Sequence, residues 1–283
     1  MDTNSVVLNR MFTQNTFKDL LSDDVISDTY YSIITRIIND PSSKKNNEIL
    51  SEIYTYMKKN YRNEYFYKNT LLNKLLLGVH KPTTTTALTE IPIGKSKADF
   101  VLINGKAVVY EIKTALDTFE RLETQLSDYY KAFDHVAVLT DKDNRKSIET
   151  KLGDSSVGIY LLSERDRISC VKKPQCYMEQ LDTGEIFKVM NKEEYEELLL
   201  QFYDELPDVP PVRYYRECKK MFCKLSISES YPAFLKVLKK RNKIIIDEFV
   251  KIPYELKSLI YFSRYKQTDY QNLNQFLQKK FEG

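Results

Sequence analysis

Two acidic residues and a lysine within a short stretch of the chain have the chemistry needed to hydrolyse a phosphodiester. Asp99 lies in one apolar run, and Glu111 and Lys113 close the next. At the two-residue period of a strand, Glu111 and Lys113 share one face and Ile112 points to the other. Carboxylates hold Mg²⁺, which activates a water, while a lysine orients the nucleophile or stabilises the transition state. Asp99 and Glu111 are therefore candidate metal ligands and, with Lys113, candidate catalytic residues.

Glu-x-Lys by itself is also common as an ion pair on a solvated strand face, so the neighbouring elements matter. Apolar and β-branched runs predict strands at 86–93, 97–103 and 107–113, joined by turns at 94–96 and at Asn104-Gly105. A strict two-residue loop at Asn104-Gly105 would place Asp99 and Glu111 on opposite faces of the sheet. A three-residue loop that includes Lys106, or a bulge, places them opposite each other. A shared metal site requires this second arrangement.

A helix is predicted directly after the third strand. Asp117 to Glu120 has the pattern of a capping box, and apolar residues then repeat at helical spacing as far as Phe133. On this helix Arg121, Gln125 and Tyr129 lie four residues apart, so they form one stripe and are candidate substrate-binding residues. The alternative is an ordinary solvated helix face. A strand at 135–139, a polar helix ending near residue 152 and a strand at 157–162 follow.

Two further acids are candidate metal ligands. Glu90 lies on the strand expected beside that of Asp99, and its alternative role is a surface carboxylate near Lys95 or Lys97. Glu64 begins an amphipathic helix. Its alternative role is a negative charge at the helix N-terminus, where the helix dipole favours it.

This order of elements and acids resembles the core of the PD-(D/E)xK nuclease superfamily. The matching residues are Asp99 and Glu111-x-Lys113, with Ala98 where the name of the superfamily has Pro. Gln125-x-x-x-Tyr129 resembles its RecB and lambda-exonuclease branch, and the run 63–162 resembles a group of small, uncharacterised bacterial proteins with this core. The resemblance implies an α/β fold with a restriction-endonuclease-like core, in which helices flank a mixed central sheet, and helical N- and C-terminal extensions. It also implies Mg²⁺ or Mn²⁺ as cofactor and DNA as substrate, with RNA left open.

The predicted core lies in the middle of a chain of 283 residues, of which 42% are hydrophobic. We expect a helical extension at 1–61, the core at 62–165 and a mainly helical region at 166–283. The chain has no apolar run of membrane-spanning length, and its first residues do not form a signal peptide, which predicts a cytoplasmic protein. Its four cysteines and two histidines have no zinc-site spacing, so they are expected to be structural. The sequence leaves the oligomeric state open.

Charge is distributed unevenly towards the C-terminus. Residues 177–208 contain ten acids and two lysines, whereas residues 213–283 contain sixteen Lys/Arg and seven Asp/Glu. A basic cluster at 236–243 (Lys236, Lys239, Lys240, Arg241 and Lys243) is a candidate DNA contact. Because a fold does not fix an activity, the alternative to a nuclease is a non-catalytic nucleic-acid-binding or protein-interaction module. A cleavage assay with Mg²⁺ or Mn²⁺ against EDTA separates the two.

Overall fold

The computed structural model describes residues 3–22 and 28–281. The chain divides into two compact units, Met1–Val79 with Lys243–Gly283, and His80–Asn242. These borders differ from those predicted at 61/62 and 165/166, because both ends of the chain contribute to one unit. Among the described residues, no helix is long and apolar enough to cross a membrane.

The first unit is helical, and its two chain segments share one core. Asn46 connects them, because it accepts a hydrogen bond from Tyr30 at 2.7 Å and donates one to the carbonyl of Phe276 at 3.0 Å. Lys45 and Lys280 form a β-bridge beside it. The helices of this unit are α1 (Thr3–Met11), α2 (Gln14–Leu21), α3 (Asp28–Ile37), α4 (Asn46–Asn60), α5 (Glu64–Leu71), α12 (Ile246–Lys251), α13 (Lys257–Phe262) and α14 (Gln267–Gln278).

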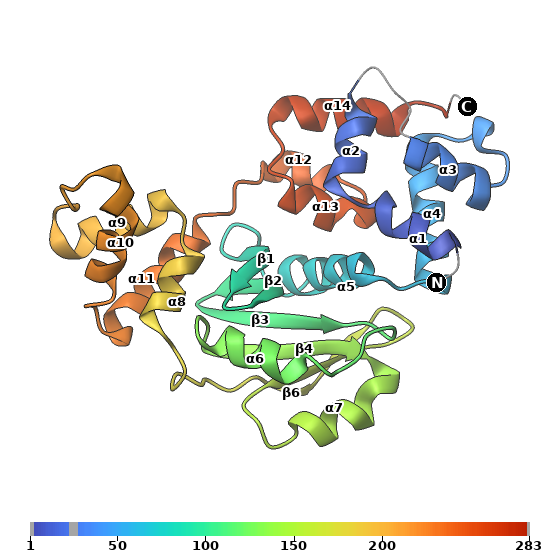
Figure 1. The fold of residues 1–283 in the computed structure, drawn as a ribbon. Coiled ribbons are helices and arrows are strands. Elements are labelled where there is room, and N and C mark those ends of the chain that lie inside the picture. The colour runs from blue at the N-terminus through green and yellow to red at the C-terminus, as the bar shows by residue number, and fades with distance from the viewer. Residues whose placement is uncertain (1–2, 23–27, 282–283) are drawn as a thin grey trace. The chain divides into compact units, whose positions relative to one another are not determined.

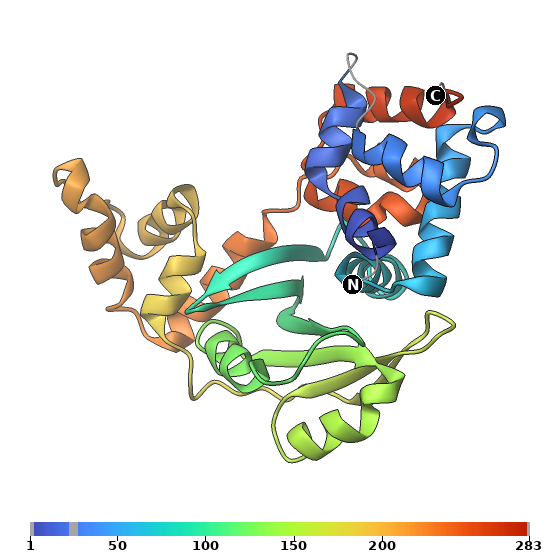
Figure 2. The same ribbon diagram turned by 45° about the vertical axis from the view of Figure 1, so that its right-hand side comes forward.

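The second unit is built on a six-stranded mixed sheet in the order β1-β2-β3-β4-β5-β6 (Figure 1, Figure 2). The first three strands form an antiparallel meander, β3, β4 and β5 are parallel, and β6 is antiparallel to β5. The strands are β1 (Thr86–Ile93), β2 (Ser96–Asn104), β3 (Lys106–Lys113), β4 (His135–Asp141), β5 (Gly158–Leu162) and β6 (Ile168–Lys172). The predicted mixed sheet flanked by helices is therefore confirmed at this level, and β6 is a strand that the sequence did not predict.

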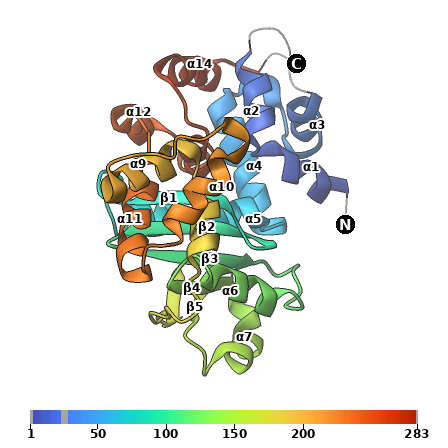
Figure 3. The same cartoon turned by 60° about the vertical axis from the view of Figure 1, so that its left-hand side comes forward.

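One face of this sheet is covered by α6 (Leu122–Tyr130), and α7 (Arg145–Leu152) packs along β5 (Figure 3). The face under α6 carries alternate residues of the strands, as the two-residue period requires. In β3 these are Ala107 and Val109, which join a core with Leu122 and Leu126 of α6. Glu111 and Lys113 continue the same alternation, so the polar end of β3 faces α6.

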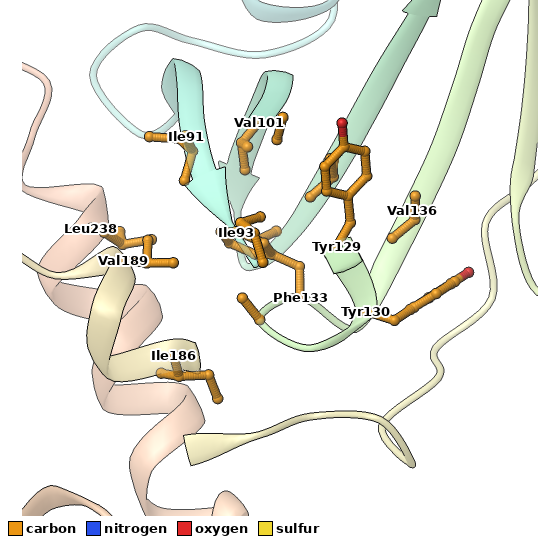
Figure 4. Close-up of a cluster of buried hydrophobic side chains, with 14 of the residues drawn as sticks. Ile91, Ile93, Val101, Tyr129, Tyr130, Phe133, Val136, Ile186, Val189 and Leu238 are labelled. Atoms are coloured by element: carbon orange, nitrogen blue, oxygen red, sulfur yellow. The ribbon is translucent and has the colours of Figure 1, made fainter. Parts of the chain in front are cut away.

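Four helices complete the second unit, α8 (Thr183–Val189), α9 (Lys192–Tyr203), α10 (Pro211–Phe222) and α11 (Ile227–Lys239). Ile186 and Val189 of α8 and Leu238 of α11 lie beside Ile91 and Ile93 of β1 (Figure 4). Asp182 caps α8 by accepting a hydrogen bond from the Glu185 amide. Ser226 caps α11 in the same way, and this helix contains Pro232.

Candidate functional site

Three carboxylates lie in register on three adjacent strands. Gly105, at φ 74°, forms the tip of the β2–β3 hairpin, and Asn104 pairs with Lys106. This is the three-residue loop that the shared site requires, because its register places Asp99 opposite Glu111. The register between β1 and β2, in which Thr89 pairs with Phe100 and Ile91 with Ala98, places Glu90 opposite Asp99. Glu90, Asp99 and Glu111 thus form a row across the sheet.

Regular strand pairing is interrupted at two positions of this row. Glu90 has φ 57°, in the left-handed region that a non-glycine residue rarely adopts. The β1–β2 pairing skips Glu90 and Asp99, and the β2–β3 pairing stops at Phe100 and Tyr110. The Asp99 carboxylate accepts a hydrogen bond from the backbone N–H of Ile112 at 2.7 Å. The side chain of Asp99 therefore serves as acceptor for β3 at the point where the backbone pairing ends.

Glu90 lies close to Asp99 and to Lys97, the neighbours that its two predicted roles require. A carboxylate oxygen of Glu90 and one of Asp99 lie within 4.8 Å of each other. Glu90 also pairs with Lys97 at 3.0 Å, and both of these side chains are exposed. The pair with Lys97 is the surface role that the sequence left open, and the proximity to Asp99 is the geometry that a metal-ligand role requires.

Glu111 and Lys113 form a buried ion pair under α6. Their side chains are 1% and 9% exposed, and Lys113 Nζ lies 2.9 Å from Glu111 Oε1. Lys113 Nζ also donates to Gln125 Oε1 at 2.8 Å, and the Tyr129 hydroxyl donates to Glu111 Oε2 at 2.5 Å. A buried charge is costly unless it is paired and hydrogen-bonded. Both charges here meet that condition through residues of α6.

Tyr129 lies at the centre of this network. Its hydroxyl is also 2.9 Å from the carbonyl oxygen of Lys97, and the residue is fully buried. Burial first, and then the negative charges of Glu111 and Asp99, raise the pKa of Tyr129 far above its ordinary value. Tyr129 therefore stays protonated and remains a hydrogen-bond donor. The carboxylates of Glu111 and Asp99 both lie close enough to raise its pKa.

The three residues of the predicted stripe, Arg121, Gln125 and Tyr129, lie in different environments. Tyr129 is buried, Gln125 is half-buried against Lys113, and Arg121 is exposed at the position before α6. The predicted capping box was wrong, because α6 begins at Leu122 and the Asp117 carboxylate accepts hydrogen bonds from the backbone and hydroxyl of Thr114. A tight turn at 114–117 thus separates β3 from the helix.

Asp128 fixes α6 to the sheet, and sequence reasoning missed it. Its carboxylate accepts hydrogen bonds from the Lys95 amide at 3.1 Å and the Ser96 hydroxyl at 2.8 Å, and it pairs with Lys131 at 2.6 Å. Burial raises the pKa of Asp128, the bonds from Lys131, Ser96 and Lys95 lower it, and the net pKa lies below the ordinary value. A Cβ on Gly94 would lie 2.5 Å from this carboxylate. Gly94, which leaves room for this carboxylate, and Ser96, which donates to it, were the signal for this contact.

Two predicted features remain, Glu64 and the basic cluster at 236–243. Glu64 is the first residue of α5 in the first unit, where it is exposed and pairs with Lys68 at 2.5 Å. In the basic cluster at 236–243, Lys240 pairs with Glu197. Arg241 is bound by Glu194 at 2.6 Å and donates to the carbonyl of Val189 at 2.8 Å. Part of the positive charge in this cluster is therefore balanced by α9.

The donors in the row are all oxygen atoms, which is the ligand set of hard cations such as Mg²⁺. The family described as Bacteriophage P4 protein cII matches residues 57–270 of this chain. That range includes the whole row, the Glu111–Lys113 pair and α6. No curated protein and no solved structure gives a significant match.

Proposed function

This chain belongs to the family described as Bacteriophage P4 protein cII, and we propose that it is a metal-dependent nuclease that hydrolyses phosphodiester bonds in DNA. The observation that carries the proposal is the row of Glu90, Asp99 and Glu111 next to the buried lysine Lys113. Carboxylates on three neighbouring strands repel one another, since like charges side by side are destabilising. A divalent cation removes that repulsion.

The residues fit Mg²⁺ or Mn²⁺. Asp99 accepts a hydrogen bond from Ile112, and Glu111 accepts from Lys113 and Tyr129. A carboxylate has about four lone-pair sites, so a carboxylate that accepts hydrogen bonds can also bind a metal. Asp99 and Glu111 would hold the ion, with Glu90 as the third candidate. When bound, the metal supplies an activated water and neutralises charge on the phosphate.

The chain's own residues then have distinct roles in the proposal. Lys113 presents a positive charge beside the carboxylates, where it stabilises the negative charge that develops on the phosphate. Gln125 and Tyr129 are positioning residues, because they touch Lys113 and Glu111 and hold them in place. Arg121, exposed at the start of the same helix, is the candidate for phosphate contact.

A cleavage assay on the full chain tests the proposal. Supercoiled plasmid, linear duplex, single-stranded DNA and RNA are incubated with Mg²⁺ or Mn²⁺, and EDTA-treated samples serve as blanks. We expect metal-dependent cleavage of DNA that is lost in Glu111→Gln. The matched control is Glu123→Gln, an exposed acid of α6 that pairs with Lys151. Cleavage that is equal in both variants, or that is absent from the folded wild type, contradicts the proposal.

A second candidate is a non-catalytic nucleic-acid-binding or protein-interaction module. The specific observation in its favour is that both oxygens of Glu111 already have partners within the chain. In such a module the Glu111–Lys113 pair serves stability alone. Binding of DNA without cleavage in any divalent metal, with equal affinity in Glu111→Gln, would establish this candidate.

A further inference from the structure

A second group of metal-binding side chains lies at the other end of the sheet. His135 is the first residue of β4 and pairs with Val108, whereas Lys113 pairs with Thr140 further along the same two strands. The two positions are five residues apart, which corresponds to roughly 16 Å at about 3.3 Å per residue. Asp134 precedes His135, and Cys176 lies in the segment between β6 and α8. This group is therefore separate from the row of carboxylates.

The three side chains converge on one point. A carboxylate oxygen of Asp134, a ring nitrogen of His135 and the Cys176 sulfur all lie within 4.8 Å of one another. The closest approaches are 2.9 Å between Asp134 Oδ1 and His135 Nδ1, and 3.6 Å between Cys176 Sγ and Asp134 Oδ2. Ligand atoms around a tetrahedral zinc ion, at about 2.0–2.3 Å from the metal, are separated by similar distances.

Hydrogen bonds from neighbouring residues hold Asp134 in place. The Tyr231 hydroxyl donates to Asp134 Oδ1 at 2.5 Å, and the Tyr177 amide donates to the Asp134 carbonyl at 2.8 Å. His135 is 8% exposed, and its buried Nδ1 forms an ion pair with Asp134 Oδ1 at 2.9 Å but has no hydrogen bond of acceptable geometry. A buried ring nitrogen without a hydrogen bond requires an explanation, and a metal ion between the three side chains supplies one.

We propose that Asp134, His135 and Cys176 bind a zinc-class divalent transition metal ion, with the fourth coordination position open to solvent. A thiolate and an imidazole select Zn²⁺ or Co²⁺ over Mg²⁺, and the carboxylate completes a three-residue set. Binding replaces the proton of the Cys176 thiol by the metal. Cys176 is exposed, so the ion can enter. Tyr231 orients the carboxylate ligand by its hydrogen bond.

The site would fasten the segment that joins the sheet to α8. Around Cys176 this segment is held by two backbone hydrogen bonds, from Gln175 to Ser156 and from Tyr177 to Asp134. A metal bond between Cys176 and β4 adds a stronger connection at the same place. Metal binding should therefore raise the thermal stability of the chain, because the ion binds the folded state only.

Cobalt spectroscopy on the full chain tests the site. The reduced protein is treated with a chelator, dialysed and titrated with Co²⁺. We expect one equivalent to produce a thiolate-to-cobalt charge-transfer band that Zn²⁺ removes. Cys176→Ser should abolish the band, whereas Cys170→Ser and Cys223→Ser, the two other exposed cysteines, should retain it. Tyr231→Phe should weaken Co²⁺ affinity about 10-fold, as loss of an outer-sphere partner does.

Two results of the cobalt titration would overturn this proposal. One is a wild-type chain that shows no thiolate band at any Co²⁺ concentration. The other is a band that persists in Cys176→Ser. Asp99→Asn should keep the band, which distinguishes this site from the row of carboxylates. Should a variant fail to fold, alkylation of the wild type gives the answer, since Zn²⁺ should slow modification of Cys176 and leave that of Cys223 unchanged. Equal alkylation of Cys176 with and without Zn²⁺ contradicts the site.

Discussion

Two buried ion pairs of the second unit look alike locally and differ in what surrounds them. Glu111 and Lys113 are 1% and 9% exposed, and Glu194 and Arg241 are 11% and 16% exposed. Glu194 also accepts a hydrogen bond from the Asn191 amide at 2.8 Å, so it caps α9 while it binds Arg241. That pair joins the end of one helix to the start of another.

Glu111, by contrast, lies beside Asp99 and in a row with Glu90. The difference shows that a buried ion pair is not evidence of function by itself, because burial with hydrogen bonds satisfies a structural pair equally well. What distinguishes Glu111 is its position in a row of carboxylates on neighbouring strands. The four predictions below separate the two pairs.

The largest expected effect is on catalysis at Asp99. Asp99→Asn keeps the size and an oxygen that can accept from the Ile112 amide, but it removes the charge that holds the metal. Loss of about 4 kcal/mol of transition-state stabilisation corresponds to about a 1,000-fold fall in cleavage rate. The melting temperature should stay close to that of the wild type. Rates measured on plasmid DNA with Mg²⁺ check this, and full activity would remove the proposed metal site.

Arg241→Ala should lower stability without changing catalysis. It leaves Glu194 partly buried without its partner, which costs about 3 kcal/mol of unfolding free energy. The rate of cleavage per folded molecule should not change. The control is Lys240→Ala, whose pair with Glu197 is exposed and should contribute little. Thermal and urea unfolding of both variants measure the difference, and a loss of cleavage without a loss of stability would make Arg241 a functional residue.

Lys113→Ala should lower both the cleavage rate and the stability of the chain. Removing a preorganised positive charge lowers turnover by about 100-fold, and the uncompensated Glu111 also lowers stability. Lys113→Arg should restore little activity, because the planar guanidinium is larger and places its donors differently. Metal affinity, measured by Mn²⁺ titration, should change little. If Mn²⁺ affinity falls as much as turnover does, Lys113 serves structure and not the transition state.

The smallest effect is expected at Tyr129. Tyr129→Phe removes the donor to Glu111, which should cost about 1 kcal/mol of stability and lower cleavage moderately. Tyr130 is the matched control, since the two rings point to different sides of α6 (Figure 4). Its buried hydroxyl has no hydrogen-bond partner, so Tyr130→Phe should be neutral. Equal melting temperatures and rates for the two variants would show that the bond to Glu111 contributes nothing.

Local patterns in the sequence were sufficient for much of the second unit. β1 has the predicted bounds, and the Asn-Gly hairpin follows from the need for a positive φ at Gly105. The sequence left its register open between a two-residue and a three-residue loop, and the structure has the second. The alternation of residues along the strand placed Glu111 and Lys113 on one face. The strand bounds, the hairpin and this shared face depend only on residues that are close along the chain or across one hairpin, so they can be predicted from the sequence.

Contacts between distant segments could not be predicted in this way. Asp128 meets Ser96, Cys176 meets Asp134, and Arg241 meets Glu194 across separations of 32, 42 and 47 residues. The sequence alone determined strands β1 to β5, the turns of the meander and the shared face of Glu111 and Lys113. Only the tertiary structure decided that Tyr129 is buried against Glu111, that a basic cluster is partly neutralised, and that the two chain ends form one unit. The reason is that periodicity specifies which face of an element is apolar, whereas the partner of that face depends on packing over the whole chain.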